Sequence, residues 1–160
     1  MLFPVIVKKL KTMEVSILII RQERPEDYDT VYHVVKEAFE AMKCSYAPYS
    51  GYHVGACVLC RDGRMFRGVN VENASYGATN CAERSALFAA VSWGVRREQI
   101  EALAIVSDGR RIGMPCGICR QVFSELLDEK TPVILSNGEQ TITLTAGELL
   151  PYRFSAEDLQ

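Results

Sequence analysis

Three cysteines and one glutamate lie in short motifs whose spacing suits metal-assisted hydrolysis. Cys81 stands two residues before Glu83, while Cys116 and Cys119 stand three residues apart directly after Pro115. Two cysteines at this spacing on one helical turn face the same side and can bind one ion together. With Cys81 as a third ligand, a tetrahedral zinc ion keeps its fourth position open for water. This arrangement is typical of a catalytic rather than a structural zinc site.

Glu83 and Arg84 carry side chains that complement such a site. Glu83 is close enough to Cys81 to reach the water as a general acid/base without ligating the metal. Zinc can lower the pKa of a bound water from about 15.7 towards about 7. Three thiolates oppose this effect with their formal negative charge. Arg84 can offset that charge by hydrogen-bonding the sulfurs.

A closed structural zinc site is the competing interpretation, because Cys57 and Cys60 form a second Cys-x-x-Cys pair. Both lie in a predicted strand, where positions three apart face opposite sides of the sheet, and their distance from Cys116 exceeds zinc-finger spacing. We therefore expect Cys44, Cys57 and Cys60 to be core or surface residues. A thioredoxin-like redox motif explains one cysteine pair but neither the third cysteine nor the glutamate.

The composition limits the class of protein. A chain of 160 residues with 48% hydrophobic content is sufficient for one domain with one core. Its 18 Lys and Arg are balanced by 20 Asp and Glu, so the chain lacks the excess of positive charge that nucleic-acid binding requires. We therefore expect a small ligand and no nucleic-acid partner. Six cysteines without a secretory signal favour the cytoplasm. No apolar stretch is long enough to predict a membrane span.

The elements that must position the motifs predict an α/β layered domain. Apolar residues at helical spacing end near Met42, and the Asp62-Gly63 turn joins two strand-like runs into a hairpin. The two cysteine motifs stand at the starts of helices, where the helix dipole favours thiolates. We expect helices over about 25–42, 81–91 and 116–127, and strands over 15–20, 52–60, 65–69, 102–106, 133–135 and 141–144.

The motifs at 81–84 (Cys-Ala-Glu-Arg) and 115–121 (Pro-Cys-Gly-Ile-Cys-Arg-Gln) closely resemble the small homotetrameric cytidine deaminases of the three-cysteine zinc type. The same pattern continues at 46–56, 68–76, 148–151 and 154–159, so the resemblance covers roughly the last three quarters of the chain. It implies a three-layer α-β-α fold whose central mixed sheet has about five strands. It also implies one Zn²⁺ per subunit and a homotetramer with shared active sites.

The resemblance further implies roles for individual residues. Cys81, Cys116 and Cys119 would hold zinc, Glu83 would move protons, and Arg84 would compensate charge. Those implied to bind substrate are Tyr52, Asn70, Glu72, Tyr76, Ala82 and Phe154.

Within the substrate-binding set, Asn70 and Glu72 would hydrogen-bond the ribose, chiefly its 3′-hydroxyl, for which an amide and a carboxylate offer suitable donors and acceptors. Tyr52 takes a position usually filled by Phe that packs on the pyrimidine, and its hydroxyl is an addition. Tyr76 and Phe154 would come from neighbouring subunits. For Tyr76, a role as a packed aromatic of the core is an equally good interpretation.

The implied reaction is the hydrolytic deamination of cytidine and deoxycytidine in pyrimidine salvage. Zinc-bound hydroxide attacks C4 of cytosine, and a glutamate acts as acid/base. Glu83 would take the proton from the water, pass it to N3 and help ammonia leave. The histidine found among the ligands of related deaminases is replaced here by Cys81. His53, in a predicted strand, is expected to be a sheet residue rather than a ligand.

The N-terminal part of the chain departs from the family. Residues 1–25 read as an extension, with a possible extra strand, before a deaminase domain at 26–160. Residues 19–28 also resemble the opening of N-acetyltransferases, but no glycine-rich turn follows that could hold the pyrophosphate of acetyl-CoA.

Other functions remain as alternatives. A blasticidin-type deaminase lacks the arginine matching Arg84, and the acidic balance of the chain disfavours nucleic-acid editing. A non-catalytic zinc-stabilised assembly module would have no use for Glu83.

Overall fold

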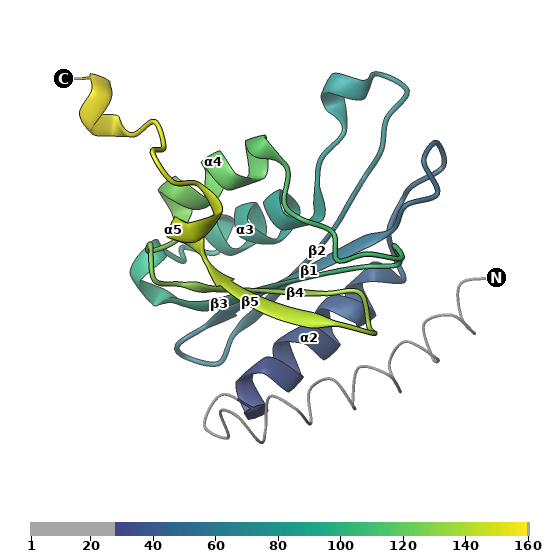
Figure 1. Cartoon of the computed structure of the whole chain (residues 1–160), viewed down its shortest axis with the longest axis horizontal. Coiled ribbons are helices and arrows are strands. Elements are labelled where there is room, and N and C mark those ends of the chain that lie inside the picture. The colour runs from purple at the N-terminus through teal and green to yellow at the C-terminus, as the bar shows by residue number, and fades with distance from the viewer. Residues whose placement is uncertain (1–27, 160) are drawn as a thin grey trace.

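The computed structural model describes residues 28–159, which form one sheet covered by helices on both faces (Figure 1). The α-β-α layering predicted from the sequence is confirmed. The predicted strand at 15–20, the start of the first helix at 25–27 and the proposed extension at 1–25 lie outside the described residues. None of the helices within 28–159 has the length and apolar character needed to cross a membrane.

The central sheet is mixed, as expected, and has five strands in the order β2-β1-β3-β4-β5. The neighbours β3 and β4 run parallel, and the other three pairs are antiparallel. The strands are β1 (Val54–Cys60), β2 (Met65–Val69), β3 (Ile100–Ser107), β4 (Pro132–Ser136) and β5 (Thr141–Thr145).

The predicted hairpin joins β1 to β2 in antiparallel register, with Val58 opposite Phe66. Gly63 adopts a φ of 85° at the turn, which a residue with a side chain rarely does. Two predicted strand boundaries were wrong by more than one residue: β3 extends from Ile100 to Ser107, beyond the predicted 102–106, and β1 begins at Val54, two residues later than predicted. The reason is that side chains replace the strand ladder before it, since Asn70 Nδ2 donates to the Tyr52 carbonyl and the His53 amide donates to Asp108.

Two separate cores lie on the two faces of the sheet. Helix α2 (Tyr28–Met42) covers one face, and α3 (Ala82–Ser92), α4 (Gly117–Leu126) and the short α5 (Ala146–Leu149) cover the other. Cys57 lies in the α2 core and Cys60 in the opposite one, so this pair cannot share an ion. Gly68 of β2 allows α3 to approach closely, because a Cβ there would clash with the backbone of Ala82 and Ala86.

Both cysteine motifs stand at helix starts, and each helix begins one residue later than predicted. Cys81 and Cys116 are the N-cap residues of α3 and α4, with extended backbones, and neither thiol caps its own helix. Several short elements had no clear signal in the sequence: α5 and the 3₁₀ segments η2 (Tyr76–Ala78), η3 (Arg97–Gln99) and η4 (Ala156–Leu159).

Candidate active site

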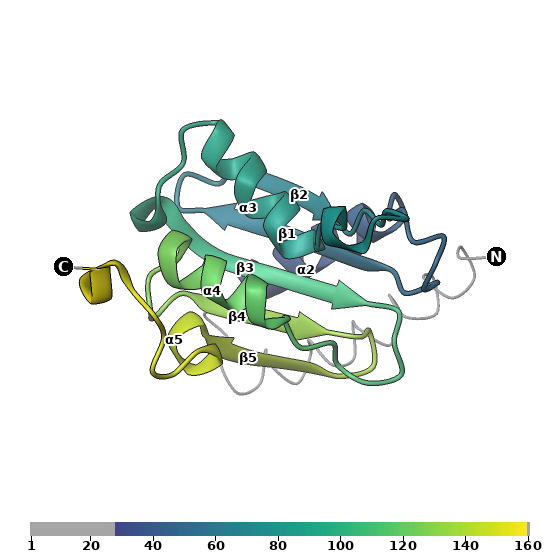
Figure 2. The same cartoon turned by 90° about the horizontal axis from the view of Figure 1, so that it is seen from above.

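The starts of α3 and α4 lie side by side on one face of the sheet (Figure 2). They bring three thiols together. The sulfurs of Cys81, Cys116 and Cys119 all lie within 4.8 Å of one another. Cys81 Sγ and Cys116 Sγ are 3.9 Å apart. Zn–S bonds of about 2.3 Å in a tetrahedron place two sulfurs about 3.8 Å apart. The three-thiol group therefore fits one zinc ion with a fourth position left over.

The thiols share protons and are close to a cation. Hydrogen bonding from Cys119, with help from Arg84, lowers the pKa of the Cys81 thiol to about 5. The same hydrogen bond raises the pKa of Cys119, which holds the shared proton. Arg84 Nη2 lies 3.7 Å from Cys81 Sγ and 3.4 Å from the Thr79 carbonyl. A divalent cation would replace the shared proton and bind all three sulfurs as thiolates.

Glu83 is a buried carboxyl on the first turn of α3. Its side chain is only 6% exposed, and this burial raises its pKa to about 7, with a smaller contribution from the negative charge of Cys81. A carboxyl that titrates near neutrality can both accept and donate a proton under physiological conditions. Glu83 lines the same cavity as Cys81 and Cys116. These are the properties required of an acid/base at a reacting centre.

A cavity of about 200 Å³ opens over the three-thiol group. It brings together seven residues that the sequence had singled out: Tyr52, Asn70, Glu72, Cys81, Ala82, Glu83 and Cys116. Seven others were missed: Val54, Thr79, Asn80, Ile105, Ser107, Gly113 and Met114. Their positions are the only signal that could have found them: Thr79 and Asn80 directly precede Cys81, Gly113 and Met114 lie just before Cys116, and Val54 stands opposite Ser107 in the β1–β3 pairing, two residues after Ile105.

Asn70 is fixed at the edge of this cavity by three hydrogen bonds. Its Oδ1 accepts from the Val54 amide at 2.8 Å and from Ser45 Oγ at 2.5 Å, and its Nδ2 donates to the Tyr52 carbonyl at 2.8 Å. The side chain is buried, at 8% exposure. An amide nitrogen has two hydrogens, so the second one is available to a ligand.

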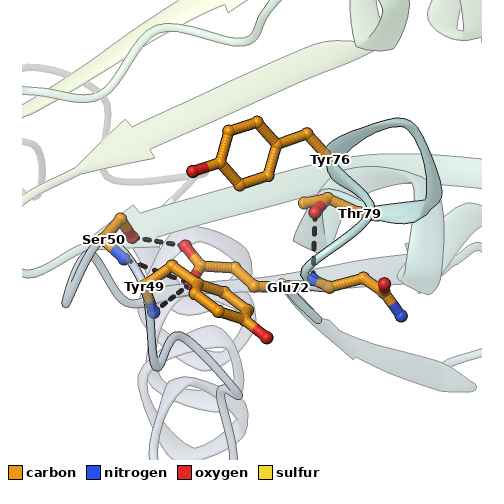
Figure 3. A pocket seen from close by; sticks show the side chains of 6 residues that line it. Tyr49, Ser50, Glu72, Tyr76 and Thr79 are labelled. Carbon is orange, nitrogen blue, oxygen red and sulfur yellow. Dashed lines mark hydrogen bonds between the residues drawn. The ribbon is translucent and has the colours of Figure 1, made fainter.

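Glu72 joins this cavity to a second one of about 370 Å³ (Figure 3). Its carboxylate accepts hydrogen bonds from the amides of Tyr49, at 2.8 Å, and Ser50, at 3.2 Å, and from the Ser50 hydroxyl. These bonds, that of the hydroxyl foremost, lower the pKa of Glu72. Glu72 is thus a fixed anion facing both spaces.

Tyr76 and Phe154 stand apart from the three-thiol group. Tyr76 lines the second cavity, where its ring extends from η2 towards the side occupied by Ser50, and it is 80% exposed (Figure 3). This exposure argues against the core role that remained open for it. Phe154 is 57% exposed, lines neither cavity, and is anchored through its carbonyl, which accepts from Gln121 Nε2 at 3.0 Å.

His53 lies outside the three-thiol group and is paired instead with Asp108. His53 Nδ1 is 2.8 Å from one carboxylate oxygen, the His53 amide donates to the other at 3.0 Å, and the Asp108 amide donates to the His53 carbonyl. This pairing ties the start of β1 to the end of β3. Nothing in the local sequence predicted it, since the two residues are 55 positions apart.

Comparisons with known proteins agree with this geometry. The family model for the cytidine and deoxycytidylate deaminase zinc-binding region matches residues 29–135. A cytidine deaminase of Halalkalibacterium halodurans is 50% identical over 127 residues, which are 79% of this chain and 95% of that protein. One of Sporosarcina psychrophila is 45% identical over 130 residues, covering 81% and 94% of the two chains.

Solved structures show the same relationship. The crystal structure of cytidine deaminase from Burkholderia pseudomallei superposes with a TM-score of 0.75 at 44% identity, covering 77% of this chain and 98% of that one. Cytidine deaminase from Mycobacterium tuberculosis gives a TM-score of 0.66 at 38% identity, covering 77% and 95%. With the three-thiol group and the five-stranded sheet, these matches establish that the chain belongs to the cytidine and deoxycytidylate deaminase zinc-binding family.

Proposed function

We propose that this protein hydrolyses the amino group from cytidine and deoxycytidine, giving uridine or deoxyuridine and ammonia. The observation that carries this proposal is the presence of a buried acid/base, Glu83, in one cavity with three thiols that fit a zinc ion. The similar proteins from Halalkalibacterium halodurans and Sporosarcina psychrophila carry the name cytidine deaminase, which supports the same substrate class.

The mechanism assigns the proton transfers to Glu83. Cys81, Cys116 and Cys119 would hold the zinc ion, which when bound would supply Lewis-acid activation of the attacking water. The Glu83 carboxylate removes a proton from that water and delivers it to N3 of the pyrimidine, which makes C4 more electrophilic. The oxygen of that water then bonds to C4, and Glu83 transfers the remaining proton of this oxygen to the amino group. The C4–N4 bond breaks, ammonia leaves, and the C4 carbonyl of uridine forms.

The remaining cavity residues orient the substrate. Asn70 offers a free amide hydrogen and Glu72 a fixed carboxylate, a donor and an acceptor that suit the ribose 3′-hydroxyl. Tyr52 presents an aromatic ring for packing on the base, and Ala82 adds an apolar contact on the first turn of α3. Arg84 offsets part of the negative charge of the three thiolates.

We also assign an assembly and a setting to the protein. A homotetramer would use Tyr76 and Phe154, both exposed in the described subunit, to complete neighbouring active sites. We propose a role in pyrimidine salvage, which the nucleoside substrate class supports, and a cytoplasmic setting with no nucleic-acid or membrane partner. Residues 26–160 would form the deaminase domain, and residues 1–25 an extension.

The direct test is ammonia release from cytidine by the purified full chain, with and without a strong zinc chelator. Release that the chelator abolishes, and that added Zn²⁺ restores, supports a zinc-dependent aminohydrolase. A folded, zinc-loaded protein that releases no ammonia from cytidine or deoxycytidine contradicts the proposal. That result would favour a non-catalytic zinc module.

A further inference from the structure

The hydroxyl of Tyr52 lies in a space that only a glycine leaves open. A Cβ built on Gly113 would stand well within 3.0 Å of Tyr52 Oη, a separation that real Cβ atoms essentially never show. The next nearest atoms to that Cβ are Ser107 Oγ at 3.2 Å, which would have to give by a few tenths of an ångström, and Ser107 Cβ at 3.6 Å, an ordinary van der Waals contact. Of these three atoms, the hydroxyl oxygen is therefore the one that a side chain at position 113 would have to displace.

The backbone conformation at position 113 does not require a glycine. The glycines of residues 28–159 that adopt a positive φ are Gly51, Gly63, Gly94 and Gly138, so Gly113 has a backbone that an alanine can adopt. Its lack of a side chain matters because of what stands next to it.

A side chain at Gly109 would meet the same ring at a different atom. A Cβ there would meet Tyr52 Cε2 at 3.0 Å and the Arg111 carbonyl at 3.3 Å. The segment between β3 and α4 thus presents two glycines to Tyr52, one at the hydroxyl and one at the ring edge. A phenylalanine at position 52 would relieve the first contact and leave the second unchanged.

The segment that carries these glycines is anchored to the rest of the domain at several points. Asp108 is paired with His53, and the buried Asn137 donates from Nδ2 to the Arg110 carbonyl at 3.2 Å. The segment ends at Cys116, the N-cap of α4. A clash at position 113 is therefore relieved more readily by rotation of Tyr52, whose ring borders the open cavity, than by displacement of the backbone.

We propose that Gly113 is a positioning residue for substrate binding, because its lack of a side chain leaves room for the Tyr52 hydroxyl beside the β3–α4 segment and so keeps the ring at the wall of the cavity, where it can pack on the base. This rests on the proposed function, in which Tyr52 packs on the base. Gly113 and Tyr52 both line the cavity that contains Glu83, so a displaced ring occupies space that the base needs. The effect falls on binding, and the acid/base and the three thiols are untouched.

The test is a double-mutant cycle of Gly113→Ala and Tyr52→Phe in the full-length, zinc-loaded protein. In the presence of Tyr52, Gly113→Ala should raise KM for cytidine about 3- to 10-fold, the range expected for forcing a side chain off its rotamer. In the Tyr52→Phe background the same substitution should change KM less than about 2-fold. In both backgrounds kcat should change less than KM, and zinc content should stay the same.

Gly109→Ala is the matched control, since its clash is with a ring carbon that both aromatic residues share. It should have the same effect on KM in both backgrounds. An equal KM rise for Gly113→Ala in both backgrounds overturns the proposal, and so does an unchanged KM when Tyr52 is present. Zinc lost from Gly113→Ala overturns it as well, because the backbone, rather than the ring, has then moved.

Thermal unfolding separates this proposal from the proposed function. If the wild-type protein releases no ammonia from cytidine, the proposed function fails. The steric pairing of Gly113 with the Tyr52 hydroxyl can then still be tested by measuring Tm for the wild type, the two single variants and the double variant. Gly113→Ala should then lower Tm when Tyr52 is present and leave it nearly unchanged in the Tyr52→Phe background. Equal Tm losses in both backgrounds overturn the pairing.

Discussion

Cys81 Sγ and Cys116 Sγ lie 3.9 Å apart, although 35 positions separate the two residues in the sequence. Each is the N-cap of a helix, and the two helices start at neighbouring points on the same face of the sheet. The positive ends of both helix dipoles favour thiolates at this point. The fold therefore brings the donors to tetrahedral spacing through backbone placement.

Removing Cys116 should cost the protein its metal and part of its stability. In Cys116→Ala two thiols remain, too few to hold zinc firmly, and the metal no longer joins α3 to α4. We expect zinc well below one per subunit by elemental analysis, and a Tm lowered by about 5 °C or more. Cys44→Ala is the control, since Cys44 is exposed and outside the three-thiol group. Full zinc occupancy in Cys116→Ala would contradict the ligand assignment.

Glu83→Gln should abolish turnover while the fold and the zinc remain. The amide has nearly the shape of the carboxyl, so the buried site is filled, but it cannot carry protons from water to N3. We expect kcat to fall by about 10²- to 10⁴-fold, the usual contribution of a general acid/base. Zinc content and Tm should match the wild type. Glu125→Gln, on the exposed side of α4, is the control that should keep full activity.

Local chemistry explains which parts of the site could be predicted from the sequence. Cys116 and Cys119 sit on one helical turn, so their spacing alone fixes their relative direction. The Asp62-Gly63 turn likewise fixes the β1–β2 hairpin, because it needs the positive φ that Gly63 adopts. In both cases the structure depends on residues close together in the chain.

Contacts between distant residues could not be predicted. Nothing near Tyr52 indicates that Asn70 and Asp108 take the place of a strand ladder around it, so the start of β1 was set too early. Gly113 had no signal either, because its importance depends on a tyrosine that lies 61 positions earlier in the sequence. Such features depend on packing that only the folded chain defines.

The buried thiol of Cys57 should make the free energy of unfolding decrease as the pH rises above 9. Burial raises the pKa of this thiol from its ordinary value of 9.0 to about 12. Above pH 9 the unfolded chain releases the proton while the folded chain keeps it, so the unfolded state is favoured as pH rises. The free energy of unfolding should lose up to about 1.4 kcal/mol per pH unit from this group between pH 9 and 12. Its stabilising contribution is fully present below pH 9.

Urea denaturation across pH 8 to 11 measures this slope. Cys57→Ala should be less stable at every pH, because it leaves a cavity, but its stability should fall less steeply with pH than that of the wild type. Val58→Ala is the packing control: it deletes a buried side chain from the opposite face of β1, contains no thiol change, and should keep the wild-type slope. Parallel slopes for Cys57→Ala and the wild type would contradict the raised pKa.

Phe154 offers a test of whether active sites are shared between subunits. It is exposed and lines neither cavity of its own subunit, so Phe154→Ala should fold normally yet raise KM if the ring completes a neighbouring site. Coexpression of Phe154→Ala with the inactive Glu83→Gln should then restore activity, because a site can take Glu83 from one chain and Phe154 from the other. Random mixing gives about a quarter of the sites both intact residues. If Phe154 acts only within its own chain, the mixture cannot exceed the activity of its Phe154→Ala subunits, and size-exclusion chromatography with light scattering shows whether both chains assemble together.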